Sequence, residues 1–426
     1  MGYRLNLYLM SEDNAVELIL DFVETNIPAV QELLTIFGAQ GKNEQLIDAR
    51  QRASASFKQA LESFVSKYAN TAPEFHKLKK IVRDLRDDEF FLLLPEPPSS
   101  TEHKFELENF LHQLNYPDQP SQNNGLHQLF GPLLQQYDIT KPRVDRHTVI
   151  GNRHRSKRKC RFCQRTAVDG ASFKSAAHAI PKALGNDFLK LGDECDECNS
   201  YFGREIEPSL IALLDIQRAF LGIQGRSSTD GRPMVLFSDG SVFHDGKKLN
   251  IRSRNVSKND ATGVISAELG KGAPIKPVDC YRGFVKIAIS VIPGEQLPYL
   301  SQTISWLRYG KHADIELPAI ATRIIGFPPS PLAEITLYIR KSNTISLPHI
   351  VAEFRLSCFV YVYAIPLSDR DTGSLVGFFD EPDFRDTFRH YAKVGSWTMQ
   401  NFNGKKRSVI APQLKFVPSR AASTTV

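Results

Sequence analysis

The amino-acid sequence predicts an α+β protein of three regions: a helical domain over residues 1–140, a central module over 141–225 and a β-containing domain over 226–426. Three observations support this fold class. The first region carries apolar residues at helical spacing, and the middle region carries two Cys-x-x-Cys pairs. The last region alternates short β-branched runs with turns that contain glycine. A chain of 426 residues is too long for one ordinary core, so we expect more than one domain.

Helical periodicity dominates the first region. Apolar residues recur every three or four positions over 46–68, and the pattern resumes over 75–85. Ser11 precedes another apolar stretch, 16–23, which we also interpret as a helix. No chemical motif occurs in this region, so we expect a helical interaction or scaffold domain that could bind a protein partner.

The last region is expected to contain most of the β-structure. Short runs at 234–237, 241–244 and 249–252 alternate with turn residues, which predicts a meander of short hairpins. Residues 353–367 are β-branched and aromatic, which indicates a central strand. Residues 284–291 are largely apolar and fit a buried helix or a buried strand equally well. The role of this region stays open, although it could also bind a partner.

Composition places the chain among soluble globular proteins. Hydrophobic residues make up 42% and charged residues 23% of the chain. The formal net charge of +6 does not by itself indicate nucleic-acid binding. The longest apolar runs are far too short to cross a bilayer, and the N-terminus lacks the segments of a secretory signal. We therefore expect a cytoplasmic protein with no membrane partner.

The central region carries the clearest chemical pattern. Four cysteines form two Cys-x-x-Cys pairs separated by thirty-one residues: Cys160, Cys163, Cys195 and Cys198. An intracellular protein keeps its thiols reduced, so such pairs indicate metal ligands before disulfides. Four thiolates can surround one Zn²⁺ and leave no open position for water, so the sequence predicts a structural zinc site.

A basic segment leads into the first cysteine pair. Between positions 141 and 165 there are ten Lys or Arg residues and one acidic residue. A solvated linker would explain such a run, but its place beside the metal-binding segment favours contact with nucleic-acid phosphates. The residues expected to bind nucleic acid are Arg153, Arg155, Lys157, Arg158 and Lys159.

The order of motifs in the central region resembles a known family. The sequence reads CRFC at 160–163, HAIPKALGN at 178–186, ECDECN at 194–199 and FG at 202–203. This arrangement resembles the HNH endonucleases, the ββα-metal nucleases, and is most similar to a bacterial subgroup with the motifs CxxC, HxIPxxLGN and ECDECN. The likeness covers about 60 of 426 residues and implies a zinc-stabilised ββα-metal module in the middle of the chain.

The resemblance implies two catalytic residues. His178 would act as the general base, since a neutral imidazole can take a proton from water near neutral pH. Asn199 would stand at the last family position, where an amide oxygen holds Mg²⁺ or Mn²⁺ or orients its water. Two other interpretations stay open: His178 as a hydrogen-bonded core residue, and Asn199 as the cap of the following helix.

One position departs from the family pattern. Many family members have an acidic residue just before the first histidine, and this chain has Ala177 there. Glu207 and Glu194 are the candidate replacement ligands of the catalytic metal, and Asp193 is a further acid nearby. Glu207 lies eight residues beyond Asn199, about two helical turns along a similar face.

Together these features predict a metal-dependent HNH endonuclease that hydrolyses phosphodiester bonds of DNA. Double-stranded DNA is the expected substrate because the family mostly cuts DNA and the basic segment suits a duplex backbone; RNA is the open alternative. A role in bacterial defence against phage or plasmid DNA follows only from where such nucleases commonly occur. The alternative from another class is a zinc-stabilised DNA-binding or scaffold protein with a degenerate nuclease centre. Ala177 favours that alternative, whereas the presence of His178 and Asn199 opposes it.

Overall fold

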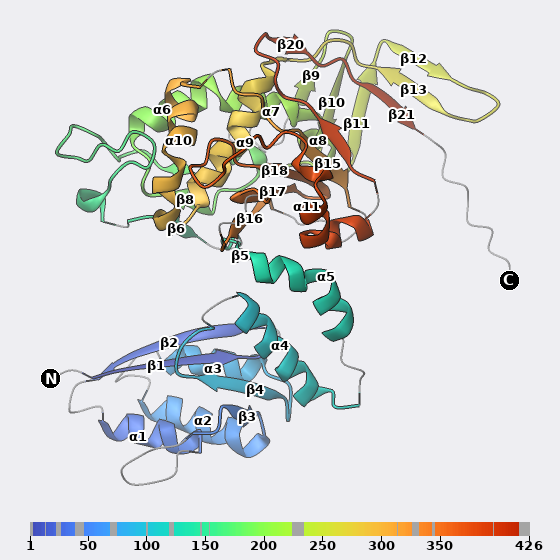
Figure 1. Ribbon diagram of the computed structural model, residues 1–426. Helices are drawn as coiled ribbons and strands as arrows, with labels where there is room; N and C mark the ends of the chain where they lie inside the picture. Colours follow the sequence, from blue (N-terminus) through green and yellow to red (C-terminus); the bar gives the residue numbers. More distant parts are fainter. Residues whose placement is uncertain are drawn as a thin grey trace. The chain divides into compact units, whose positions relative to one another are not determined.

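Two compact units, Met1–Gln135 and Gln136–Val426, make up the chain in the computed structural model (Figure 1). The structure describes residues 3–12, 14–22, 27–38, 47–68, 75–98, 101–118, 123–144, 147–152, 154–223, 234–312, 314–325, 332–342, 346–394 and 396–416. Helices and strands occur in both units, which confirms the α+β class. The boundary expected near residue 225 does not separate compact units, because it lies inside the second one. Within the described ranges, no helix combines the length and apolar character needed to span a membrane.

The first unit is an antiparallel sheet with helices, so the expectation of a purely helical domain is wrong. The sheet has the order β2-β1-β4-β3, with β1 (Tyr3–Met10), β2 (Ala15–Phe22), β3 (Arg50–Arg52) and β4 (Phe90–Leu94). The helices are α1 (Ile27–Ile36), α2 (Ala55–Tyr68), α3 (Phe75–Asp84), α4 (Thr101–Asn115) and α5 (Asn123–Gln136), of which the last reaches the unit boundary. Leu18 of the sheet and Leu33 and Phe64 of the helices share one buried core.

Residues 16–22 form most of β2 rather than the expected helix. Val16 and Leu18 pack on the core while the residue between them is exposed, which is the period of two that a strand requires. Ser11 closes the turn between β1 and β2, where its hydroxyl accepts a hydrogen bond from the Asn14 amide at 3.1 Å. A short apolar run can satisfy either period, and pairing with β1 selected the strand.

The second unit is built on a six-stranded antiparallel sheet of order β19-β15-β18-β17-β16-β5. Its strands are β5 (Tyr137–Thr140), β15 (Ile320–Ile324), β16 (Glu334–Arg340), β17 (Ile350–Leu356), β18 (Phe359–Ala364) and β19 (Thr398–Gln400). Helix α9 (Pro277–Val291) packs on this sheet, with the Tyr363 hydroxyl donating to the Phe284 carbonyl at 2.7 Å. Residues 284–291 are therefore helical, and every residue of α9 from Asp279 to Val291 is buried.

Residues 353–367 do not form one central strand. They contain the end of β17 and all of β18, which pair as an antiparallel hairpin with Leu356 opposite Phe359. Ser357 takes a positive φ of 57° in the two-residue turn. Residue composition correctly indicated β-structure here. The turn at Ser357 and Cys358 contains no glycine or proline, so the sequence did not show that the chain reverses direction between two strands.

Smaller elements surround the main sheet. The sheet of β9 (Met234–Leu236), β10 (Gly240–His244) and β11 (Leu249–Ser253) is antiparallel and confirms the meander expected there. Further strands are β12 (Asn255–Lys258), β13 (Ile265–Glu268) and β21 (Gln413–Phe416) in one sheet, and β14 (Pro274–Ile275) and β20 (Ser408–Val409) in another. Further helical elements are η4 (Gly294–Leu300), α10 (Ser301–Tyr309), η5 (Phe378–Asp380), α11 (Pro382–Thr387) and η6 (Arg389–Val394).

The central segment completes the second unit. It contains β6 (Thr148–Ile150), η2 (Arg155–Lys157), β7 (Ala177–His178), η3 (Lys182–Leu184), β8 (Leu189–Leu191), α6 (Asp196–Glu205), α7 (Glu207–Leu213) and α8 (Asp215–Phe220). Ile180 and Leu210 of this segment share one hydrophobic core with Phe284 of α9. The segment is therefore packed on α9 and is not a separate compact body.

Candidate nuclease site

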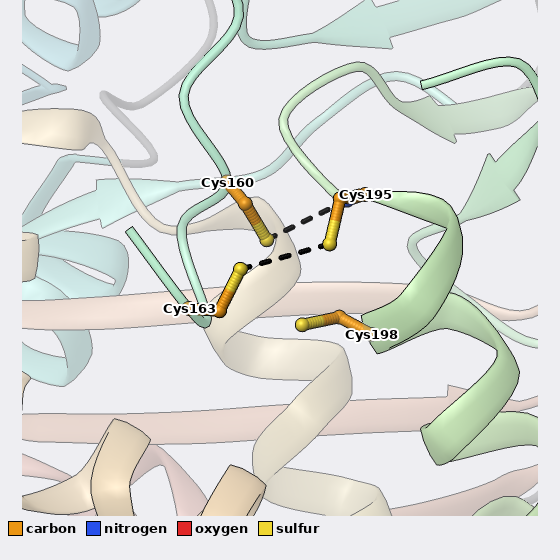
Figure 2. A group of neighbouring side chains, drawn as sticks. All are labelled: Cys160, Cys163, Cys195 and Cys198. Atoms are coloured by element: carbon orange, nitrogen blue, oxygen red, sulfur yellow. Dashed lines mark hydrogen bonds between the residues drawn. The ribbon is translucent and has the colours of Figure 1, made fainter. Parts of the chain in front are cut away.

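The four predicted cysteines meet at one point between two turns of the chain. Figure 2 shows the side chains of Cys160 and Cys163 facing those of Cys195 and Cys198, and their sulfur atoms all lie within 4.8 Å of one another. Cys163 Sγ is 3.6 Å from Cys195 Sγ. Tetrahedral zinc with Zn–S bonds of ~2.3 Å requires S–S separations of ~3.8 Å, so the residues fit this ion. Three of the four cysteines are fully buried, which suits a closed structural site.

Charged side chains from a distant helix support the cysteine cluster. Arg308 of α10 donates from Nε to Cys198 Sγ at 3.3 Å and from Nη2 to Glu197 Oε1 at 2.6 Å. Arg165 pairs with the other carboxylate oxygen of Glu197. Guanidinium groups beside four thiolates offset the excess negative charge that a zinc–thiolate site carries, and such outer partners orient the ligands.

A β-hairpin followed by a helix forms the frame around His178. Strand β7 pairs antiparallel with β8, with His178 opposite Lys190, and β6 adds a parallel strand on the far side of β8. The chain then passes through the second cysteine pair, and Cys195 is the N-cap of α6. This order of strand, strand and helix is the ββα arrangement that the motifs predicted.

Asn186 organises the hairpin loop and is more than a turn residue. It is fully buried, and its Oδ1 accepts hydrogen bonds from the amides of Phe188 at 3.1 Å and Leu189 at 2.9 Å. Its Nδ2 donates to the Ala333 carbonyl, just before β16, at 3.2 Å. Gly185 precedes it at a φ of 87°, where a side chain would be strained. One amide thus holds the loop closed and ties it to the main sheet.

His178 has one ring nitrogen held by a carboxylate. Its Nε2 lies 2.8 Å from Asp187 Oδ1, and the other Asp187 oxygen accepts from Lys182 Nζ at 2.8 Å. The His178 side chain is 15% exposed. A carboxylate at Nε2 favours the tautomer with the proton on Nε2, which leaves Nδ1 as the basic nitrogen. Within the described part of the chain, Nδ1 has no hydrogen-bond partner.

The environment keeps His178 neutral near pH 7. Burial lowers its pKa below the ordinary value of 6.5, and this effect outweighs the opposing influence of the hydrogen bond to Asp187. Hydrogen bonds from Lys182 and from His178 lower the pKa of Asp187 to about 2. At neutral pH the pair is therefore an uncharged imidazole beside an ionised carboxylate, the state that a general base requires.

The two acids proposed as metal ligands are both paired with a buried lysine. Lys286 Nζ of α9 lies 3.4 Å from Glu194 Oε2 and 3.3 Å from Glu207 Oε1, and it donates to the His178 carbonyl at 3.0 Å. The side chains of Lys286 and Glu194 are 1% and 0% exposed. Burial raises the pKa of Glu194 to about 7. Burial alone would lower the pKa of Lys286, but Glu194 and Glu207 outweigh it and raise that pKa.

The helical relation expected between Asn199 and Glu207 is wrong, since α6 ends at Glu205 and Glu207 begins α7. Asn199 lies inside α6, half-buried, and Cys195 holds the N-cap position, so Asn199 is not the cap. Its amide nitrogen donates to the Cys195 carbonyl at 2.9 Å. No described residue makes a hydrogen bond to its side chain, which leaves the carboxamide oxygen available.

The basic segment is anchored at its base and exposed beyond it. Asp193 Oδ1 accepts a hydrogen bond from the Asn152 amide at 2.9 Å, so this acid holds the base of the segment. Arg158 donates from Nε to the Asn152 carbonyl at 2.8 Å. Three of the predicted contact residues are exposed, namely Arg155, Lys157 and Lys159. Arg153 lies outside the described residues.

Sequence reasoning missed two residues beside His178. Asp187 directly follows the HAIPKALGN motif, and an acidic residue in the loop of a histidine hairpin was the signal for it. Lys286 could have been found from the polar residues that interrupt an apolar stretch at helical spacing: Asp279, Arg282, Lys286 and Ser290. No sequence spacing predicts that Asp187 contacts the His178 ring or that Lys286 contacts the His178 carbonyl.

Comparison with known proteins agrees with this geometry. No curated protein and no solved structure gives a significant match to the chain. Residues 160–214, which include the four cysteines, His178 and Asn199, match the family model of HNH endonucleases. The resemblance inferred from the motifs is thus confirmed, and the chain carries an HNH endonuclease domain at residues 160–214.

Proposed function

We propose that this chain is a metal-dependent endonuclease that hydrolyses phosphodiester bonds of DNA, with His178 as the general base. The observation that carries the proposal is the environment of the His178 ring in the ββα hairpin. Nε2 faces Asp187 at 2.8 Å, and Nδ1 is not hydrogen-bonded by any described residue. A water molecule can give its proton to Nδ1, while the Asp187 carboxylate stabilises the imidazolium that forms.

The cysteine cluster has a structural part in this proposal. Four sulfur atoms within 4.8 Å of one another suit one tightly bound Zn²⁺. Because four thiolates leave no open coordination position, this ion would not activate water. Its contribution is to join the turn that carries the first cysteine pair to the start of α6, and so to hold α6 beside the hairpin.

A separate divalent ion, Mg²⁺ or Mn²⁺, is the expected catalytic cofactor. Apart from the cysteines, no group of three His, Cys, Asp or Glu side chains among the described residues is close enough to hold a metal. The ion would therefore take few protein ligands, which suits Mg²⁺ bound largely by water and substrate phosphate. Asn199 would supply an amide oxygen, whereas the contacts of Glu194 and Glu207 with Lys286 oppose their assignment as ligands. When bound, the ion supplies charge stabilisation at the leaving oxygen.

The basic segment is the proposed contact with the DNA backbone. Arg155, Lys157 and Lys159 are exposed on the segment that leads into the first cysteine pair. Such side chains bind phosphates without reading the base sequence. Arg153 and Arg158 belong to the same proposed surface, and the first unit is the proposed site of a protein partner.

The test is incubation of the purified chain with supercoiled plasmid in Mg²⁺, Mn²⁺ or excess chelator. Wild type should convert the plasmid to nicked or linear forms only with a divalent ion. His178→Ala should lower the rate of cleavage by on the order of 10²- to 10⁴-fold, while His76→Ala, a matched change at an exposed histidine of α3, should retain the wild-type rate. Equal cleavage by His178→Ala and wild type would show that chemistry occurs elsewhere.

A second function, a zinc-stabilised DNA-binding or scaffold protein, is favoured by one specific observation. Ala177 stands where many family members have a metal-binding acid, and both candidate replacements contact Lys286. This alternative gains support if the wild type binds plasmid and cuts neither DNA nor RNA with any divalent ion. Preferential cutting of RNA would keep the catalytic site and change only the substrate.

A role in bacterial defence against foreign DNA is the widest part of the proposal. It is tested by plating phage on bacteria that express the wild-type chain or His178→Ala at equal levels. Protection that depends on His178 would support the role, and equal plating efficiencies would remove it.

A further inference from the structure

Helix α9 places the charged side chain of Lys286 inside the HNH domain, although α9 lies outside the matched segment. Residues 160–214 match the HNH family, whereas Lys286 lies far beyond them in the chain. Its side chain is 1% exposed and lies 5.8 Å from the centre of the Phe202 ring in α6. A buried ammonium group is costly unless its surroundings satisfy its charge and its three donors.

Two carboxylates balance the charge of Lys286, and the backbone carbonyl of His178 accepts a hydrogen bond from it. Two carboxylates face Nζ, Glu207 Oε1 at 3.3 Å and Glu194 Oε2 at 3.4 Å. The third neighbour is the His178 carbonyl, which accepts a hydrogen bond from Nζ at 3.0 Å. One side chain therefore joins β7, the segment before the second cysteine pair, and α7.

We propose that Lys286 is a positioning residue for the general base: its ammonium group holds the backbone carbonyl of His178, and Glu194 and Glu207 hold that ammonium group in place. This inference rests on the proposed function of His178. The ring of His178 is held separately by Asp187, so the base is fixed at two points, one on the side chain and one on the backbone.

The need for a backbone anchor follows from the shortness of β7. This strand contains only Ala177 and His178, and it is paired with β8 on one side. Two residues of pairing give little resistance to displacement of the strand end. A shift of about 1 Å at a catalytic group can cost on the order of 100-fold in rate. The hydrogen bond from Lys286 Nζ to the His178 carbonyl restrains the position of His178 against such a shift.

This arrangement also gives the two acids a different role from the one expected. Glu194 and Glu207 serve Lys286, and through it the backbone of His178, rather than a metal ion. Neither acid touches the reacting atoms in this assignment, so neither is a catalytic residue. The HNH domain then depends on α9 for its geometry, which agrees with the hydrophobic core that the two share.

The test compares three variants of the full chain. Lys286→Met removes the anchor but leaves two buried carboxylates without their partner, so the variant could fail to fold for that reason alone. The triple variant Lys286→Met/Glu194→Gln/Glu207→Gln removes those charges as well as the anchor. Cys280→Ala is the matched control, because Cys280 is a buried residue of α9 that contacts the Ser209 carbonyl and not β7.

Cleavage kinetics and amide hydrogen exchange, with zinc content and DNA binding as controls, separate a positioning role from a general loss of stability. We expect the triple variant to bind one zinc per chain and to bind DNA as wild type does, with kcat lowered about 10- to 100-fold and KM unchanged. Amide hydrogen exchange over residues 177–191 should be faster in the triple variant than in wild type and Cys280→Ala. A folded triple variant with wild-type exchange over 177–191 would overturn the proposal whether or not the protein is a nuclease.

The activity measurement then distinguishes this inference from the proposed function. Cleavage by wild type and loss of cleavage in His178→Ala would establish the general base. A triple variant with wild-type kcat in that situation would overturn only the role of Lys286. If wild type does not cleave, the proposed function fails, while faster exchange over 177–191 in the triple variant still supports the anchor.

Discussion

The cysteine cluster and the His178 hairpin belong to the same HNH domain but have opposite surroundings. Three of the four cysteines are fully buried, and each sulfur atom lies within 4.8 Å of the other three. The His178 ring is partly exposed, with one nitrogen held by Asp187 and the other without a described hydrogen-bond partner. The first site is largely buried and all four of its sulfur atoms face one point, as a structural metal requires. The second site keeps one basic atom available, as a catalytic group requires.

Both sites receive contacts from outside the matched segment, since Arg308 of α10 donates to Cys198 Sγ, but the two sites differ in how their own residues are brought together. The cysteines are supplied by two short turns, and neither turn needs a distant residue to bring its own pair together. The hairpin of His178 is held from outside the matched segment, by the Ala333 carbonyl on Asn186 and by Lys286 on the His178 carbonyl. Disturbing the cysteines should therefore affect folding first, and disturbing the hairpin should affect chemistry first.

Loss of the metal is expected to have the largest effect. Cys160→Ser should lose zinc and lower the free energy of unfolding by several kcal/mol, since structural zinc binds with roughly 10–16 kcal/mol in small domains. Elemental analysis and thermal unfolding measure the two quantities. Cys358→Ser, at a half-buried cysteine outside the cluster, is the control and should retain zinc. Well-folded wild-type protein without zinc would contradict the assignment of the site.

Removal of the proposed general base should have the next largest effect, and this effect should fall on the rate of cleavage alone. His178→Ala should lower kcat by on the order of 10²- to 10⁴-fold, because the base acts on water in the transition state. Zinc content and DNA affinity should stay near wild type, which sets this variant apart from Cys160→Ser. A variant that loses zinc together with activity would show that the two sites are not separable.

Asp187→Asn should have a smaller effect with a distinctive pH dependence. The loss of an orienting carboxylate typically costs about 10- to 100-fold in activity. Asp187 raises the pKa of His178, so without it the pKa falls further below 6.5. Activity that depends on neutral His178 rises with pH through this pKa, so the rising limb of the pH–rate profile should move to lower pH. A limb that moves to higher pH would contradict the role assigned to Asp187.

Each residue of the basic segment should make the smallest contribution of all, and this contribution is to DNA affinity. Neutralising Arg155, Lys157 and Lys159 together should weaken DNA binding about equally for all sequences. Each lost phosphate contact should reduce the slope of log affinity against log salt by roughly 0.9. The matched control is Lys247→Ala/Lys248→Ala, at exposed lysines in the turn between β10 and β11. An unchanged slope would show that the segment does not touch DNA.

Local spacing was sufficient to identify the cysteine cluster, and the resemblance of the neighbouring motifs to HNH endonucleases implied the ββα order around it. The two Cys-x-x-Cys pairs, the HAIPKALGN run and the helix after the second pair each depend on residues close together in the chain. The same holds for the hairpins of β9, β10 and β11, whose turn residues lie within the pattern itself. Predictions of this kind succeed because the physical cause and the sequence signal occupy the same few positions.

Long-range packing decided the remaining features, and no short pattern could have supplied them. Residues 16–22 became a strand because β1 pairs with them, although the run fits either period. Glu194 and Glu207 both contact Lys286 of α9, and no pattern within the HNH motifs predicted this partner. A buried charge is stabilised by whichever opposite charge the fold places beside it. For Glu194 and Glu207 that partner is Lys286, about eighty to ninety residues further along the chain. Spacing within the HNH motifs therefore indicated the residue types of the site, and only the packing of α9 against them determined what each acid contacts.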